Sequence, residues 1–204
     1  MIIGPGFIWL HFPKCAGSFT EKLLRRVAPR DGSVVFDPID PKQVTWHHTI
    51  RQRERKTGTS LAGKEIVCNF RRLPYWIISR IQYEQKRTGK AVPREMYIKG
   101  SFFEQDGREC HADLYVERYS EPQVDHWIRT EFIREDFSNV FSRYFDLDQE
   151  IINDFMKEKI NVSGWDGDLS KWFGPGDLER LYESCPKWKV LEMELYGDLV
   201  TDRF

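Results

Sequence analysis

The chain has 204 residues, of which 40% are hydrophobic and 14% aromatic. This apolar content can form a sizeable core, which excludes an intrinsically disordered chain and favours one domain over residues 1–204. The 31 Lys and Arg residues nearly balance the 32 Asp and Glu residues, and the net charge of −1 excludes a generally cationic nucleic-acid coat. We therefore expect no nucleic-acid partner. No stretch approaches the roughly 20 apolar residues of a membrane span, so we also expect no membrane span.

The four cysteines, Cys15, Cys68, Cys110 and Cys185, lie far apart and form no CxxC pair. We therefore expect neither a zinc site nor a disulfide framework. The apolar opening residues lack the basic region and the small-residue cleavage site of a signal peptide. A reduced, cytoplasmic location is the expectation.

The first predicted unit is a strand, a tight loop and a helix. Residues 7–12 (FIWLHF) form an apolar run typical of a buried strand, which Pro13 ends. Ser18, with Glu21 three residues later, matches a capping box and predicts the start of a helix that Pro29 ends.

Later elements alternate in the same way. Strands are predicted within residues 33–36, 65–70 and 124–130, and a polar excursion or lid over residues 88–109. Helices are predicted from Pro74 onward and within residues 131–145, 151–159, 177–185 and 189–196. The order predicts an α/β fold with a P-loop-like, mainly parallel central sheet flanked by helices.

The loop between the first strand and the first helix has the composition of an anion-binding site. Gly17 permits close backbone approach, Ser18 and Thr20 add hydroxyls, and Lys14 supplies a charge next to the helix N-terminus. An ordinary capped strand–turn–helix with an incidental lysine is the alternative. Lys14 precedes Gly17, which is the reverse of the GxxxxGK[ST] order and disfavours an ATPase or a GTPase.

Residues 10–19 (LHFPKCAGSF) resemble the HIPKTAGTS segment of sulfotransferases, especially those of the carbohydrate type. The resemblance implies binding of the 5′-phosphosulfate of 3′-phosphoadenosine 5′-phosphosulfate (PAPS). The residues that it would assign to this group are Lys14, Cys15, Ala16, Gly17, Ser18, Phe19 and Thr20. Cys15 stands where threonine is usual in the family.

Residues 67–74 (VCNFRRLP), with Ser79 beyond them, resemble the strand, RxP and helical serine that bind the 3′-phosphate in this family. Arg72 keeps the family's distance to Pro74, whereas Arg71 keeps the distance to Ser79. Both arginines are candidates, because arginine at a strand end suits bidentate phosphate contact. Arg71 is slightly favoured, because the family's arginine and serine hold the same phosphate. Taken alone, the two arginines would also fit solvated charges at a strand end.

The resemblance implies transfer of a sulfuryl group from PAPS to a hydroxyl or amine acceptor, with the 3′,5′-bisphosphate PAP as product and no metal. A small molecule or a glycan would be the acceptor. Lys14 would neutralise the sulfuryl group and the leaving oxygen. A general base is also required, and His48 and His47 are the candidates, His48 slightly ahead. His11 is interpreted as structural.

Two other functions stay open. One is a P-loop-like small-molecule kinase, and the other is a non-catalytic relative that binds a nucleotide or a glycan. Residues 51–56 (RQRERK) would either steer an anionic acceptor or form a solvated helix face.

Overall fold

The computed structural model describes residues 1–38, 45–58, 60–104, 106–158 and 167–201. They form two compact units, Met1–Phe70 with Tyr119–Asn161, and Arg71–Arg118 with Val162–Phe204. Each unit is considered by itself below. The single domain expected over residues 1–204 stays a prediction.

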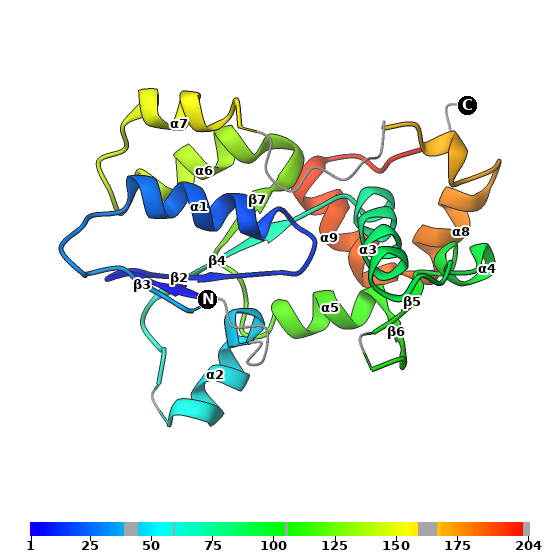
Figure 1. Ribbon diagram of the computed structural model, residues 1–204, viewed down its shortest axis with the longest axis horizontal. Coiled ribbons are helices and arrows are strands. Elements are labelled where there is room, and N and C mark those ends of the chain that lie inside the picture. The colour runs from blue at the N-terminus through cyan, green and yellow to red at the C-terminus, as the bar shows by residue number, and fades with distance from the viewer. Residues whose placement is uncertain (39–44, 59, 105, 159–166, 202–204) are drawn as a thin grey trace. The chain divides into compact units, whose positions relative to one another are not determined.

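The first unit is built on a five-stranded sheet of order β3-β1-β2-β4-β7 (Figure 1). The strands are β1 (Ile2–Ile3), β2 (Phe7–Leu10), β3 (Val35–Phe36), β4 (Glu65–Phe70) and β7 (His126–Arg129). β2 pairs with β4 and β4 pairs with β7 in parallel, whereas β1 is antiparallel to both of its neighbours.

The α/β class is therefore confirmed, but the prediction of a mainly parallel sheet was wrong, because the sheet is mixed. The physical reason is the short connection between β1 and β2, in which the Gly4 N–H donates to the Phe7 carbonyl at 2.9 Å. So short a connection can join only antiparallel neighbours, since a parallel pair needs a crossover of a dozen or more residues.

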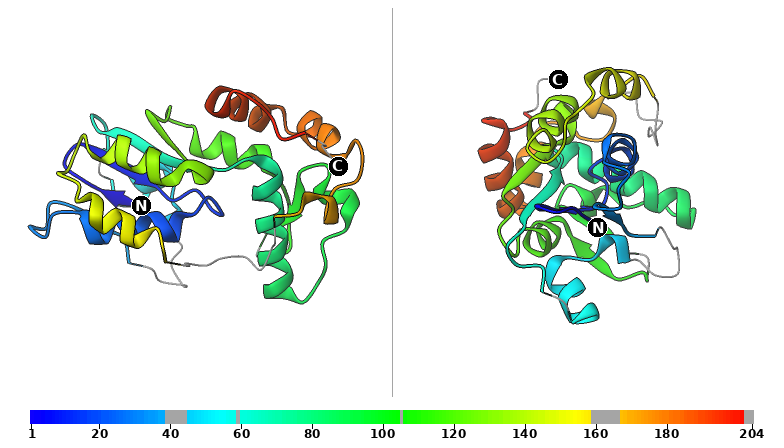
Figure 2. Two further views of the ribbon diagram at one scale, coloured as in Figure 1. Left: turned by 90° about the horizontal axis from the view of Figure 1, so that it is seen from above. Right: turned by 90° about the vertical axis from the view of Figure 1, so that its left-hand side faces the viewer.

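Helices cover both faces of this sheet. They are α1 (Gly17–Val27), η1 (Thr45–His47), α2 (Ile50–Thr57), η2 (Thr130–Phe132), α6 (Ile133–Phe141) and α7 (Gln149–Phe155). Figures 1 and 2 show α1, α6 and α7 on one face and α2 on the other. The predicted helix within residues 131–145 is thus a short 3-10 turn followed by α6.

The core of the first unit lies between the sheet and the helices α1, α6 and α7. Alternate residues of β2, Phe7 and Trp9, enter it, as the two-residue period of a strand requires. On the helix side, the buried rings of Phe137 and Phe141 pack at a tilt with centroids 4.7 Å apart, and the Phe7 ring meets Phe141 edge-on at 5.3 Å. This packing fixes the direction in which β2 delivers the chain to the loop before α1.

The second unit is mostly helical. Its elements are α3 (Leu73–Thr88), α4 (Arg94–Tyr97), β5 (Ser101–Phe103), β6 (Glu109–His111), α5 (Ala112–Tyr119, whose last residue belongs to the first unit), η3 (Leu169–Lys171), α8 (Asp177–Ser184) and α9 (Pro186–Tyr196). The predicted lid over residues 88–109 holds α4 and most of an antiparallel β5–β6 hairpin. Trp76 of α3 is the centre of the core, with its ring 4.7 Å from Trp188 and 5.4 Å from Phe102. The sequence also predicts a loop over residues 161–168, most of which lies outside the described residues.

Among the helices that the structure describes, none combines the length and the apolar character needed to cross a bilayer.

Candidate anion site at the start of helix α1

The loop of residues 11–16 joins the carboxyl end of β2 to the first turn of α1. β2 and β4 run in parallel with Leu10 opposite Cys68, so the loop leaves the sheet at the edge where both strands end. In open α/β sheets this is the edge at which ligands bind.

Two residues of this loop adopt the left-handed conformation without being glycine. Lys14 has φ of 67° and Ala16 has φ of 57°. Each costs roughly 1–2 kcal/mol for an L-residue with a Cβ. Cys15 between them is fully buried, and its N–H donates to the Phe12 carbonyl at 3.4 Å. Backbone strain of this kind is common in ligand-binding loops.

The helix begins two residues earlier than its sequence pattern predicts. Ala16 is the N-cap of α1, Gly17 is its first residue, and no side chain caps it. The capping box predicted from Ser18 and Glu21 was therefore wrong. The left-handed Ala16 turns the chain into the helix before Ser18, and the Glu21 carboxylate instead accepts hydrogen bonds from Arg25 at 2.9 and 3.0 Å.

The first turn of α1 presents two backbone donors, the N–H groups of Gly17 and Ser18, whereas the next two N–H groups bond within the turn. The N–H groups of Phe19 and Thr20 both donate to the Ala16 carbonyl at 3.0 Å. Within the part of the chain that the structure describes, the N–H groups of Gly17 and Ser18 have no acceptor. Two such donors at the positive end of an eleven-residue helix favour an anion.

Thr20, a predicted cofactor-binding residue, points into the unit. It is fully buried, its hydroxyl accepts from Asn69 Nδ2 at 2.8 Å, and Asn69 Oδ1 accepts from Trp9 Nε1 at 2.7 Å. The same hydroxyl lies 3.4 Å from the Ala16 carbonyl, to which it donates. Thr20 thus ties the loop to β2 and β4, and of the two hydroxyls singled out in the sequence, the half-buried Ser18 is the more accessible.

Phe19, also predicted to bind the cofactor, contacts Phe155 of α7 edge-on, with ring centroids 4.9 Å apart. Its side chain contributes to packing between helices α1 and α7.

The structure brings one of the two predicted bases to this loop. His47 Nδ1 lies 2.9 Å from the His11 carbonyl oxygen, and the two imidazole rings are 4.4 Å apart. A carbonyl can only accept, so Nδ1 of His47 carries the proton and the lone pair of the neutral ring is on Nε2. The Tyr119 hydroxyl donates to the His47 carbonyl at 2.6 Å, which holds η1 in place.

His48, the slightly favoured base, has a different environment. Its Nδ1 is buried and has no hydrogen-bond partner in the described residues. Burial, and then the charges of Arg53 and Lys56, lower the pKa of His48 below its usual value. Among the described residues, Nδ1 of His48 therefore has no hydrogen bond that would fix the tautomer of its ring, in contrast to Nδ1 of His47.

The second predicted phosphate motif belongs to the second unit. Arg71 directly follows β4, and Ser79 is half-buried on α3. Arg72 is held by carboxylates, with NH2 at 2.5 Å from Asp198 Oδ1 and NH1 at 3.4 Å from Glu192 Oε1. These contacts occupy the Arg72 guanidinium.

The basic run on α2 is divided between two environments. Arg53 is paired with Asp37 and donates to the Thr45 carbonyl at 3.1 Å, so it stabilises the segment before the helix. Arg51 pairs with Glu121 at the surface, and Arg55 and Lys56 are exposed.

A cysteine–histidine contact in the other unit does not form a nucleophile pair. Cys185 Sγ lies 3.8 Å from His111 Nε2, and burial raises the pKa of the Cys185 thiol. His111 Nδ1 accepts from the Asp113 N–H at 3.3 Å, so Nε2 carries the proton, which it donates to the Lys99 carbonyl at 2.9 Å. A protonated Nε2 cannot deprotonate the thiol.

Among the described residues, no group of three or more His, Cys, Asp or Glu side chains is arranged to hold a metal ion. Comparison of the chain with protein-family models, with curated proteins and with solved structures gives no match.

Proposed function

We propose that the chain is a PAPS-dependent sulfotransferase that transfers a sulfuryl group to a hydroxyl or amine acceptor, a small molecule or a glycan. The observation that carries the proposal is the first turn of α1. There the unpaired N–H groups of Gly17 and Ser18 lie beside the strained loop of Lys14, at the carboxyl edge of the parallel strands. The resemblance of residues 10–19 to the PAPS-binding segment supports the choice of anion.

Each residue has a distinct part in the proposed reaction. The Gly17 and Ser18 N–H groups bind the 5′-phosphate, and Lys14 neutralises the charge that develops on the leaving oxygen. The resemblance of residues 67–74 assigns the 3′-phosphate to Arg71 and Ser79. Like phosphoryl transfer, the reaction depends mainly on positioning and on electrostatic stabilisation.

His47 is the proposed base. Its Nε2 lone pair takes the proton from the acceptor, and the acceptor oxygen or nitrogen forms a bond to sulfur. The bond between sulfur and the 5′-phosphate oxygen breaks, and PAP leaves with the electron pair. We prefer His47 to His48 because the hydrogen bond from Nδ1 to the His11 carbonyl orients its ring and fixes its tautomer.

The first experiment is a thermal shift of the purified protein with PAP, compared with ATP plus magnesium. At about 100 times its dissociation constant, a ligand adds roughly 2.7 kcal/mol to the free energy of unfolding. For a chain of this length that corresponds to about 5–10 °C in Tm. We expect this shift with PAP, and we expect Lys14→Ala and Arg71→Ala to reduce it.

Absence of a shift with PAP would overturn the proposal, and a shift with ATP and magnesium in its place would indicate a kinase. Turnover is then measured with PAPS and a panel of hydroxyl and amine acceptors, carbohydrates included. PAP binding without transfer to any acceptor would indicate a non-catalytic relative. With a working acceptor, His47→Gln should abolish turnover and retain PAP binding, whereas His48→Gln should retain both.

A further inference from the structure

The ring of His11 lies directly against the first residue of α1. His11 is 8% exposed, and a Cβ built on Gly17 would lie 2.0 Å from His11 Nε2 and 1.9 Å from Cδ2. The Nε2 edge of the imidazole thus lies at the place where the helix presents its unpaired N–H groups. Among the described residues, neither ring nitrogen of His11 has a hydrogen-bond partner.

The surroundings of His11 keep its ring neutral. Burial first, and then His47, the amino group of Met1 and Lys14, hold the pKa of His11 well below its usual range. The ring of Trp9 on β2 lies 5.3 Å from the His11 ring and carries no charge. A positive charge on His11 would therefore be both desolvated and close to other basic groups.

A neutral imidazole carries one proton, on either nitrogen. Nδ1 of His11 is buried with no acceptor among the described residues, and a buried N–H without an acceptor is costly. Nε2 lies against Gly17, at the edge where the anion would lie. The tautomer with the proton on Nε2 therefore places the donor toward the anion and leaves a lone pair inside.

We propose that His11 is a binding residue of the anion site, donating a hydrogen bond from neutral Nε2–H to a phosphate oxygen beside the Gly17 and Ser18 N–H groups. The inference rests on the proposed function and deepens it. It assigns the role of phosphate ligand to the side chain of His11, whose sequence context indicates a structural role. A neutral donor orients the phosphate through a directional hydrogen bond and adds no second positive charge next to Lys14.

The first test needs no substitution. Two-bond ¹H–¹⁵N correlation spectra of the wild-type protein report the tautomer of each histidine. We expect His11 to carry its proton on Nε2, to have a pKa well below the usual histidine range, and to shift on addition of PAP or inorganic pyrophosphate. A proton on Nδ1, or a His11 signal unchanged by both anions, would overturn the inference.

The second test compares His11→Phe with His11→Gln. The phenylalanine ring fills the same space without a donor, so PAP affinity should fall about ten- to hundredfold, the usual cost of a hydrogen bond to a charged group. Glutamine keeps an N–H donor and should recover part of the affinity. His126→Phe, on β7 and thus two strands away from β2, is the matched control and should bind PAP like the wild type.

The outcomes separate the two proposals. Equal PAP affinity in His11→Phe and the wild type would refute the role of His11 and leave the sulfotransferase proposal standing. A pyrophosphate response at His11, with PAP binding no tighter than pyrophosphate, would confirm the anion site and refute the nucleotide. If His11→Phe does not fold, as judged by circular dichroism, the wild-type spectra alone decide.

Discussion

The edge of the His11 ring occupies the space that a side chain on Gly17 would need, since a Cβ at Gly17 would lie 1.9 Å from His11 Cδ2. Glycine is therefore required at the first residue of α1 by a neighbouring ring, even though its own backbone angles are helical. This contact can be tested without knowledge of any ligand.

Gly17→Ala should displace either the ring or the loop. We expect a loss of about 1–3 kcal/mol in the free energy of unfolding, the usual cost of overpacking, together with weaker PAP binding. In a His11→Ala background the Cβ has room, so the same substitution should cost far less. Urea unfolding of the two single variants and the double variant gives the coupling energy directly, and additive effects would contradict the contact.

Ala16→Gly should stabilise the protein. The left-handed conformation costs alanine roughly 1–2 kcal/mol, and the added flexibility of glycine offsets roughly 0.5–1 kcal/mol of that gain. The expected net gain is about 0.5–1 kcal/mol by urea unfolding. Ala28 follows α1 with φ of −66°, so Ala28→Gly is the matched control and should destabilise. A loss of stability in Ala16→Gly would show that the loop has no strain to relieve.

Asn69→Ala should be among the most damaging polar substitutions in the first unit. It leaves the buried Trp9 indole N–H without its acceptor and the Thr20 hydroxyl without its donor. At about 1–3 kcal/mol for each unsatisfied group, we expect a loss of about 2–5 kcal/mol. Asn139→Ala, at an exposed position of α6, should stay within about 0.5 kcal/mol of the wild type. Similar stabilities for the two variants would argue against the network.

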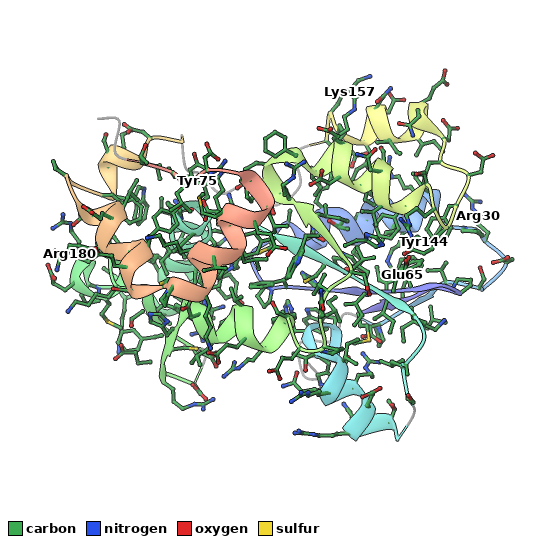
Figure 3. All side chains as sticks on the ribbon, turned by 180° about the vertical axis from the view of Figure 1, so that it is seen from behind. Arg30, Glu65, Tyr75, Tyr144, Lys157 and Arg180 are labelled. Atoms are coloured by element: carbon green, nitrogen blue, oxygen red, sulfur yellow. The ribbon has the colours of Figure 1, made fainter. Side chains whose placement is uncertain are left out.

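Tyr144→Phe should raise the pKa of Glu65. Figure 3 shows the two side chains close together, and the Tyr144 hydroxyl donates to the Glu65 carboxylate. This hydrogen bond is the main cause of the lowered pKa of Glu65, and Arg143 and His126 add to it. Because the folded-state pKa is lowered, the interaction stabilises above the unfolded-state value and is lost as pH falls through the folded one.

The carboxyl ¹³C shift of Glu65, followed between pH 2 and pH 7, reports this pKa in both proteins. The midpoint should move upward in Tyr144→Phe at any ionic strength. Arg143→Gln should cause a smaller shift that salt screens, since Arg143 is about half exposed. An unchanged midpoint in Tyr144→Phe would exclude the hydrogen bond as the cause.

Arg72→Ala should destabilise the second unit whether or not a nucleotide binds. Glu192 is fully buried and also accepts from the Leu73 N–H and the Tyr182 hydroxyl, each at 2.8 Å. Removing the arginine leaves a buried charge without its cation, at a cost of about 3 kcal/mol. Glu192→Gln in the Arg72→Ala background should recover part of that loss. Unchanged stability in Arg72→Ala would instead return Arg72 to the candidate phosphate ligands.

Much of the fold could be predicted from hydrophobic pattern. The run of residues 65–70 (EIVCNF) gave β4 with the bounds that the structure has, because four of its six residues are apolar, as expected for a strand that is buried along most of its length. β1 has only two residues, too short for any periodicity, and its antiparallel pairing makes the sheet mixed. The helix α5 and the β5–β6 hairpin were missed within polar stretches.

The site was predictable in composition and not in geometry. Residues 14–18 indicated an anion loop, but nothing in the sequence indicates that Lys14 and Ala16 are left-handed, since neither residue type prefers that conformation. The prediction of a capping box at Ser18 was wrong for this reason. His11 was interpreted as structural because its contact with Gly17 exists only once the loop has turned, and no spacing rule encodes such a turn.

The hydrogen bond that orients His47 ends on the main-chain oxygen of His11, not on its side chain. Every amino acid has that oxygen, so this contact tolerates substitution at position 11 wherever the backbone path is kept. Position 11 can therefore be randomised to change which anion the loop prefers while the proposed base keeps its orientation. Substitutions at position 11 can therefore change the proposed recognition of the ligand, which depends on the side chain, separately from the alignment of the proposed base, which depends on the main chain.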